Sequence, residues 1–302
     1  RDITDALEEK LREYGCHIVF KKVTGLLISD GKITGVKTAD RKHNFDAVIL
    51  ATGGVSYPGT GSKGDGHEFA RRAGINVTPL SPSLVPVVTK ERTGELMGLT
   101  LKNVTLNVFR GDKKVFSELG EMLFTHFGVS GPLVLSASAH MQTGSVSDHR
   151  FFIDLKPALS HEELDARVIS DLKKYNTRDL VNSMGDLLPK KMISPLLRAA
   201  AVSERVKCCE VTKEARRRLV ETLKAYPLNP TEFRPINEAI VTCGGVDVKE
   251  IDPKTMMSKK IPGLFFAGEL IDLDAYTGGY NLQIAWSTGR LAGEGAAEYI
   301  FQ

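Results

Sequence analysis

The fold is decided by an apolar run that ends in two glycines, Phe45-Asp46-Ala47-Val48-Ile49-Leu50-Ala51-Thr52-Gly53-Gly54. Residues 45–51 are apolar except for Asp46, which is typical of a strand buried on both faces of a parallel sheet. A glycine turn directly after such a strand lets the backbone approach a ligand closely, because glycine has no side chain. The run therefore predicts an α/β fold of the nucleotide-binding type.

The segments before this run fit the same sheet. Residues 1–14 carry apolar side chains at helical spacing, and Gly15 is placed to end that helix. Residues 16–20 predict a strand. Residues 25–29 and 32–38 predict a hairpin, because Asp30-Gly31 between them suits the positive φ angles of a tight turn. This order of elements is a nucleotide-binding pattern without its first part.

Farther along the chain the pattern changes twice and then returns. From about residue 79, short β-like runs predict a small β domain, and residues 160–226 predict helices that start with a capping box from Ser160 to Glu163. Residues 263–268 predict a second buried strand, followed by a glycine turn and a helix with Trp286 in the core. We therefore expect residues 45–51 and 263–268 to share one sheet. The expected divisions are 1–79 and 259–302 for the α/β domain, 80–156 and 232–258 for the β domain, and 157–231 for a helical insertion.

The composition excludes several classes of protein. The 302 residues include 42% hydrophobic and 25% charged residues, as expected for two or three globular units rather than a disordered chain. No apolar run reaches the ~20 residues that cross a bilayer. The 40 basic and 37 acidic residues are interspersed, so no single-sign field selects nucleic acid or membrane. Four cysteines without metal-ligand spacing predict reduced thiols in a cytoplasmic protein and no metal site.

Two conspicuous motifs are interpreted as structural. The string Gly59-Thr60-Gly61-Ser62-Lys63-Gly64 fits GxGxxG but begins seven positions after Thr52, too far from the strand for a pyrophosphate turn. The loop could still lie near a cofactor. The string Arg216-Arg217-Arg218 could indicate a nucleic-acid patch. Glutamates at positions 210, 214 and 221 favour a solvated helix face instead.

The strongest chemical motif lies near the C-terminus. Residues 261–267 are followed by Gly268-Glu269, then by Asp272, and then by Thr277-Gly278-Gly279-Tyr280-Asn281-Leu282-Gln283. A strand that ends in glycine and an acid brings a carboxylate to a polyol, whose hydroxyl groups donate hydrogen bonds to it. Exposed amides at the start of the next helix stabilise negative charge, as on N1 and O2 of a reduced flavin.

Four strings together resemble the bacterial aminoacetone oxidase-like (BaiN-type) flavoproteins, a family of NAD(P)/FAD-dependent oxidoreductases. They are residues 46–54 with Ser56-Tyr57-Pro58, residues 61–66, residues 123–132 and the C-terminal motif, and the resemblance covers nearly the whole chain. It implies a glutathione-reductase-like FAD-binding domain interrupted by a β-barrel-like domain and a small helical one. The family opens with a strand, a GxGxxG turn and an acidic residue that are not found here. We therefore expect an FAD-binding domain that is incomplete at its N-terminus and supplies only part of the cofactor contacts.

The same resemblance implies roles for individual residues. It places Val23 at the adenine through its backbone, and Ala51, Thr52, Gly53 and Gly54 at the turn beside the pyrophosphate. The acidic contacts near the ribityl chain and pyrophosphate come from Glu269 and Asp272, next to Gly268. The flavin edge is contacted by Gly278, Gly279, Asn281, Leu282 and Gln283. The candidate catalytic residues are Tyr280, as a substrate contact, and His126, whose imidazole either titrates near neutral pH as an acid or base or packs structurally.

The sequence thus predicts an FAD-dependent oxidoreductase that accepts a hydride from a small substrate, with an amine as the candidate implied by the resemblance. One alternative is an NAD(P)H-driven reductase of an unsaturated substrate. Alternatives of another class are a flavin-fold protein that acts on or binds RNA, and a non-catalytic fragment. We expect a small-molecule substrate and neither a nucleic-acid nor a membrane partner. The sequence does not indicate the oligomeric state.

Overall fold

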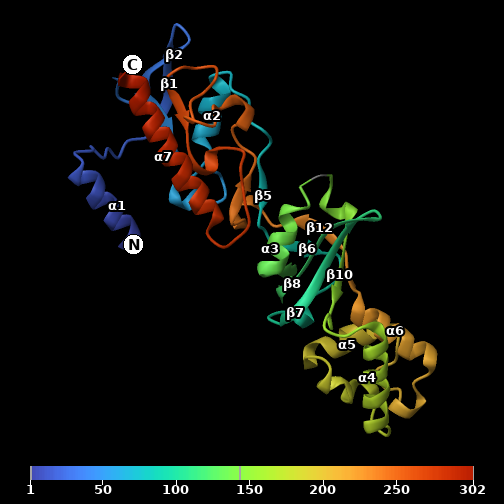
Figure 1. The fold of residues 1–302 in the computed structure, drawn as a ribbon. Coiled ribbons are helices and arrows are strands. Elements are labelled where there is room, and N and C mark those ends of the chain that lie inside the picture. The colour runs from blue at the N-terminus through green and yellow to red at the C-terminus, as the bar shows by residue number, and fades with distance from the viewer. Residues whose placement is uncertain (1, 143, 302) are drawn as a thin grey trace.

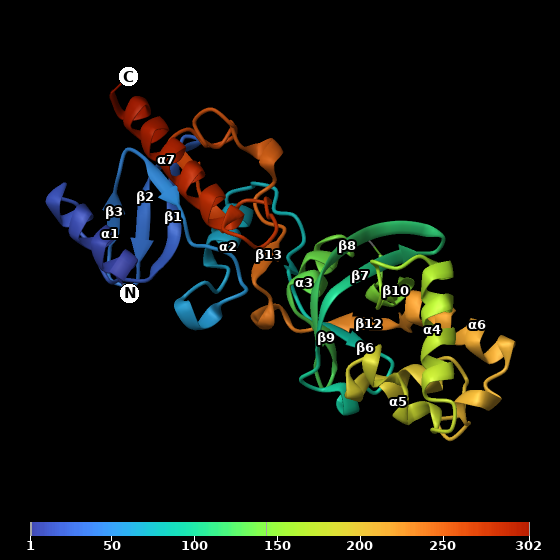
Figure 2. The same ribbon diagram turned by 60° about the horizontal axis from the view of Figure 1, so that its bottom comes forward.

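The computed structural model describes residues 2–142 and 144–301. Figure 1 shows three units in a row: an α/β unit built from both ends of the chain, an antiparallel sheet, and a group of helices at the far end. The view in Figure 2 shows the same order of units. The chain leaves the α/β unit after α2 (Asp65–Arg72) and returns to it with β14 (Leu264–Phe266) and α7 (Tyr280–Phe301).

The centre of the α/β unit is a pair of parallel strands from distant parts of the chain. Strand β4 (Val48–Leu50) pairs with β14, with Val48 opposite Leu264 and Leu50 opposite Phe266. These residues pack with α2 and α7 in one hydrophobic core that also contains Phe69 and Ala292. The expected sharing of one sheet by residues 45–51 and 263–268 is confirmed.

An antiparallel sheet of three strands adjoins this pair. It consists of β1 (Val23–Ser29), β2 (Lys32–Thr38) and β3 (Lys42–Asn44). Asp30 and Gly31 turn the chain between β1 and β2 with φ angles of 51° and 75°. The hairpin predicted from this dipeptide is therefore confirmed. The preceding helix α1 (Asp2–Glu13) exposes Ile3, Leu7 and Leu11.

Three local predictions are wrong. Residues 16–20 form no strand, because among the described residues no neighbouring strand supplies hydrogen-bond partners, and Phe20 is 92% exposed. Strand β4 is shorter than predicted and is not buried on both faces, since Ile49 is 40% exposed. Trp286 is 58% exposed rather than in the core, because it lies on the side of α7 that faces away from β14 and the core.

The middle unit is a sheet of seven strands in the order β11-β10-β7-β8-β9-β6-β12. Its edge strands β11 and β12 are separated in the chain by Asn229 alone, so one continuous segment supplies both edges. Helix α3 (Pro132–Ala139) packs on β8. The strands are β6 (Val87–Thr89), β7 (Thr100–Arg110), β8 (Lys113–Phe124), β9 (Gly128–Ser130), β10 (His149–Asp154), β11 (Tyr226–Leu228) and β12 (Pro230–Phe233). A separate pair, β5 (Ser81–Ser83) and β13 (Val241–Cys243), leads back toward the α/β unit.

The helical unit contains α4 (His161–Lys174), α5 (Lys190–Ala199) and α6 (Lys213–Lys224). The capping box predicted at the start of α4 is confirmed, because the Glu163 N–H donates to Ser160 Oγ and the Ser160 N–H donates to Glu163 Oε2. Buried side chains of these helices and of the seven-stranded sheet form one continuous core. The helices are therefore anchored to the sheet rather than folded around a core of their own.

The arginine run of residues 216–218 lies on α6. Arg216 bonds Asp165 at 2.7 Å, and Arg217 lies 3.4 Å from Glu214 and 3.2 Å from Glu221. The solvated face with interleaved glutamates is confirmed for Arg217 only, because Arg216 is half-buried against Asp165 and Arg218 donates to the carbonyls of Ala200 and Ala201. None of the described helices is long and apolar enough to cross a membrane.

Candidate functional site

The carboxyl ends of β4 and β14 meet at Glu269, in the turn that follows β14. Glu269 Oε1 accepts a hydrogen bond from the Thr242 N–H at 2.8 Å and another from Ser56 Oγ at 3.1 Å. The Thr242 hydroxyl in turn accepts the Val55 N–H at 2.8 Å. The turn after β4, strand β13 and the turn after β14 are thus joined through one carboxylate oxygen. No bond to the second oxygen, Oε2, is present among the described residues, and that oxygen remains available to a ligand.

Two glycines make this close approach possible. A Cβ on Gly54 would lie 2.3 Å from Thr242 Oγ1 and 2.4 Å from Glu269 Oε1, closer than real side chains come. A Cβ on Gly66 would lie 2.1 Å from Thr52 Oγ1. Gly66 belongs to the first turn of α2, so the N-terminus of this helix lies directly beside the predicted pyrophosphate turn. The start of α2, which follows the glycine loop of residues 59–64, therefore borders the candidate site.

The start of α7 forms the other side of the site. Gly278 and Gly279 have φ angles of 111° and 94°, a backbone shape that residues with side chains rarely adopt. They end an exposed loop, after which the first amides of α7 have no acceptor within the helix. The Gly268 N–H donates to Thr288 Oγ1 at 2.9 Å, which fixes the turn after β14 against α7. The loop before α7 is tied to the strand pair next to Glu269, because Asp274 accepts a hydrogen bond from Ser83 Oγ of β5, which pairs with β13.

The other predicted cofactor residues have their own partners. Asn281 clamps the loop before α7, because its side chain accepts from the Ala275 N–H at 2.9 Å and donates to the Ala275 carbonyl at 2.7 Å. Gln283 donates through its side chain to Ser287 Oγ, and Leu282 is exposed. Asp272 is half-buried and its N–H donates to the Val246 carbonyl.

Farther from this cluster, two predicted residues lie on the sheet. Val23 is the first residue of β1, opposite Thr38, and it packs against the core of the α/β unit. Ala51 directly follows β4 and is exposed. The preceding Lys22 pairs with Asp65 of α2 at 3.2 Å, so the start of β1 is tied to the glycine loop.

The two candidate catalytic residues lie in different units. Tyr280 is the first residue of α7 and is 62% exposed. His126 is exposed in the turn between β8 and β9, with its ring edge-on to Phe127 at 5.0 Å. No described contact joins either residue to Glu269. The sequence did not reveal a histidine–tyrosine pair at the loop before α7. His140, at the end of α3, forms a hydrogen bond with the Tyr276 hydroxyl.

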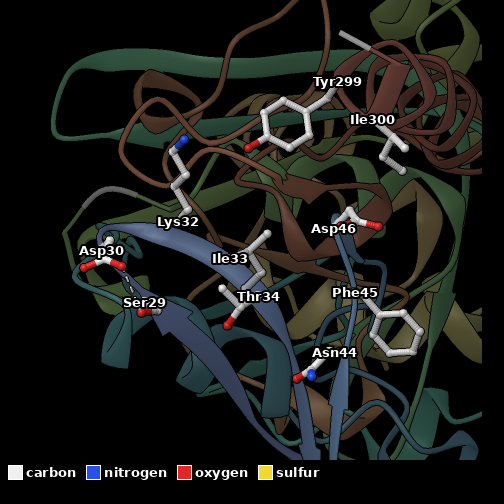
Figure 3. A pocket seen from close by; sticks show the side chains of 10 residues that line it. All are labelled: Ser29, Asp30, Lys32, Ile33, Thr34, Asn44, Phe45, Asp46, Tyr299 and Ile300. Carbon is white, nitrogen blue, oxygen red and sulfur yellow. Dashed lines mark hydrogen bonds between the residues drawn. The ribbon is translucent and has the colours of Figure 1, made fainter.

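A large open depression in the surface lies elsewhere. Figure 3 shows it between the β1–β2 hairpin and the end of α7, lined among others by Asp46, Phe45 and Tyr299. Asp46 precedes β4, whereas ligands of open α/β sheets bind outside the carboxyl ends of the strands. Since α7 has 22 residues, its two ends are about 33 Å apart. This depression is therefore a separate feature from the Glu269 site.

The donors and acceptors of the Glu269 site suit a flavin nucleotide. The amides at the start of α7 can hold the flavin edge, Glu269 Oε2 can accept from a ribityl hydroxyl, and the glycines of the turn after β4 leave room for a phosphate. A metal is a poorer fit, because no group of three or more His, Cys, Asp or Glu side chains converges among the described residues.

A buried histidine, His67, lies in the first turn of α2, next to Gly66. His67 of α2 is fully buried, and neither ring nitrogen has a hydrogen-bond partner among the described residues. Burial, with a contribution from the Arg71 charge, lowers the pKa of His67 to about 4. The imidazole is therefore neutral at physiological pH.

We expect this histidine to make the fold acid-sensitive. The pKa of His67 is lower in the folded protein than in the unfolded chain. Its contribution to the free energy of unfolding is therefore complete above pH 6.5 and is lost as the pH falls toward 4. Urea unfolding at pH 7.5 and 5.5 should give free energies of unfolding that differ by roughly 1 kcal/mol from this residue alone. In His67→Leu that part of the difference should disappear. An unchanged difference in the variant would show that other groups cause the acid sensitivity.

Together, the parallel β4–β14 pair, the glycine turn and the helix α7 define a Rossmann-like α/β fold of the kind that binds FAD. The sequence profile of the HI0933-like protein Rossmann domain matches residues 1–295. The chain therefore belongs to the HI0933-like family.

Three curated relatives show what the chain is similar to. It is 33% identical to a ribosomal RNA dihydrouridine synthase of Haemophilus influenzae over 95% of this chain and 70% of the relative. It is 32% identical to the Escherichia coli protein of the same name over 80% of this chain and 58% of that relative. It is 28% identical to a 3-dehydro-bile acid delta(4,6)-reductase of Clostridium scindens over 98% of this chain and 73% of the relative. The matches thus span 58% to 73% of these relatives, whose names indicate a family of enzymes.

Proposed function

We propose that the protein is an FAD-dependent oxidoreductase with a glutathione-reductase-like FAD-binding domain, into which the seven-stranded sheet, as a barrel-like domain, and the helical unit are inserted. The observation that carries this proposal is the meeting of Gly54, Thr242 and Glu269 at the carboxyl ends of β4 and β14, next to the loop that leads into α7. In this assignment Glu269 Oε2 holds a ribityl hydroxyl, and the first amides of α7 stabilise negative charge on the flavin edge. The bound flavin supplies the hydride chemistry.

The proposed reaction is the reduction of a carbon–carbon double bond conjugated with a carbonyl group. Dihydrouridine is uridine with two hydrogens added across such a bond, and a delta(4,6)-reductase removes double bonds from a steroid skeleton. The two names share this chemistry, and neither concerns an amine. The amine expected from the resemblance therefore has no support from these relatives, and the unsaturated-substrate alternative is favoured. NAD(P)H is the proposed source of electrons.

Uridine in an RNA is the first candidate substrate. The Haemophilus influenzae and Escherichia coli relatives, each above 30% identity, both carry the RNA name. Residues 157–231 contain fourteen Lys and Arg against ten Asp and Glu, but several of these cations, such as Arg216 and Arg217, are paired with acidic side chains. The support for RNA therefore comes from the names of these relatives and not from a basic face. This proposal replaces the expectation that nucleic acid is not a partner.

A small unsaturated ketone is the second candidate, because the bile-acid relative matches 98% of the chain. To separate the candidates, the NADPH-reduced protein is given unmodified ribosomal RNA in one reaction and a steroid 4-en-3-one in another. The first candidate predicts dihydrouridine by mass spectrometry, with a yield that falls steeply as salt rises. Reduction of the ketone alone, without salt dependence, would favour the second candidate. Product from neither substrate would contradict the proposed reaction.

A further inference from the structure

A hydrogen-bonded pair bridges the α/β unit and the middle unit beside the proposed flavin edge. His140, at the end of α3, bonds through Nε2 to the Tyr276 hydroxyl. The two rings have centroids 5.6 Å apart, and Phe116 of β8 supports the imidazole at 5.3 Å. The pair is formed by residues 136 positions apart, and none of the cofactor contacts proposed above uses it.

Tyr276 is held close to the start of α7. It lies four residues before Tyr280, the first residue of that helix, and the clamp of Asn281 on Ala275 folds its loop against the first turn. Asp274 fixes the same loop to β5 by accepting a hydrogen bond from Ser83 Oγ at 2.7 Å. The Tyr276 side chain remains 36% exposed. Tyr276 is therefore held by a fixed loop and is partly exposed at the junction of the two units.

We propose that Tyr276 is the proton donor to the substrate and that His140 is its positioning residue. This proposal rests on the proposed function, because reduction of a conjugated double bond needs a proton as well as a hydride. A reduced flavin held at the site would supply the hydride to the β-carbon, and the π electrons of the double bond would move toward the carbonyl. Tyr276 would then give its proton to the α-carbon, the O–H bond breaking as the C–H bond forms, and solvent would return a proton to the tyrosinate.

The surroundings of Tyr276 suit this role. In the tautomer that carries a proton on Nε2, His140 donates to the tyrosine oxygen, so the tyrosine proton points elsewhere and the tyrosinate is stabilised once it forms. Burial, together with the negative charge of Glu118, raises the pKa of Tyr276 above its ordinary value. The hydroxyl therefore keeps its proton at physiological pH until a strongly basic carbon accepts it.

The test compares wild type with Tyr276→Phe and His140→Ala. The flavin is reduced with dithionite in the absence of oxygen, and its reoxidation by unmodified ribosomal RNA and by a steroid 4-en-3-one is followed. We expect Tyr276→Phe to lower the maximal reoxidation rate by about 100-fold or more, with the flavin affinity and the half-saturating substrate concentration unchanged. His140→Ala should lower it about tenfold. Without flavin or substrate, the ring resonances of His140 should shift in Tyr276→Phe, because the pair is lost.

A matched control is Tyr299→Phe, which removes a tyrosine hydroxyl near the opposite end of α7. It should leave the reoxidation rate unchanged. If the flavins of wild type and Tyr276→Phe are reoxidised at the same maximal rate, the proton-donor role is overturned. The His140–Tyr276 pair would then only join the two units, and the proposed function would stand. Unshifted His140 resonances would also overturn it, because the contact would then be absent in solution. If neither substrate reoxidises the wild type, both proposals fail.

Discussion

Replacing Glu269 with alanine is expected to weaken flavin binding by roughly tenfold to a hundredfold. The substitution would remove a charge-assisted hydrogen bond between the carboxylate and the ribityl chain, and this loss weakens the binding free energy by about 1.5–3 kcal/mol. The substitution also leaves the buried Thr242 N–H and the Ser56 hydroxyl without their acceptor. Titration of the apoprotein with FAD, followed by quenching of flavin fluorescence, measures the affinity.

Two variants separate the charge of Glu269 from its structural role. Glu269→Gln keeps an oxygen that can accept from Thr242 and Ser56, so its thermal stability should stay close to that of wild type while flavin binding weakens. His126→Ala should leave the flavin affinity unchanged, because His126 has no described contact with this site. Equal affinities for wild type, Glu269→Gln and Glu269→Ala would remove Glu269 from the cofactor site.

Gly54→Ala is expected to disrupt the junction of the two strand ends more generally. The added methyl group would lie 2.3 Å from Thr242 Oγ1 and 2.4 Å from Glu269 Oε1, so at least one of these groups must move. Thr242 is buried, and its hydroxyl also holds the Val55 amide. Overpacking of this kind costs about 1–3 kcal/mol of stability. We therefore expect lower stability in urea unfolding and a large loss of flavin affinity.

Gly59→Ala is the matched control for this substitution. A Cβ on Gly59 meets no atom within 4 Å, and its φ angle is not in the left-handed region. Gly59 lies five residues after Gly54, and its replacement by alanine should leave both stability and flavin affinity unaltered. If the two variants behave alike, the close packing of Gly54 against Glu269 is not needed for the site.

The parts of the fold that were predictable are those that depend on neighbouring residues. The Asp30-Gly31 dipeptide indicated its hairpin because the required φ angles are local, and Ser160 with Glu163 indicated the start of α4 for the same reason. The apolar run of β14 identified it as a buried strand without knowledge of its partner. The glycine and acid at its end indicated the position of the candidate site.

Contacts between distant segments could not be predicted in this way. The Thr242 N–H reaches Glu269 across 27 positions, and the Thr242 hydroxyl reaches Val55 across 187, and no local pattern marks Thr242 as part of the site. The pairing of His140 with Tyr276 was missed for the same reason. Residues 16–20 had the composition of a strand, but a strand also needs a neighbour, which a local pattern cannot supply.

The most direct test of a flavin site in this protein is the visible absorbance spectrum of the purified protein under anaerobic conditions. We expect a flavin band when FAD is added, bleaching of this band by NADPH or dithionite, and recovery of the band when unmodified ribosomal RNA or a steroid 4-en-3-one is added. Glu269→Gln should show a weaker band at the same protein and FAD concentrations. Protein that stays colourless at saturating FAD, or that binds FAD equally well after Glu269 and Gly54 are replaced, would contradict the account.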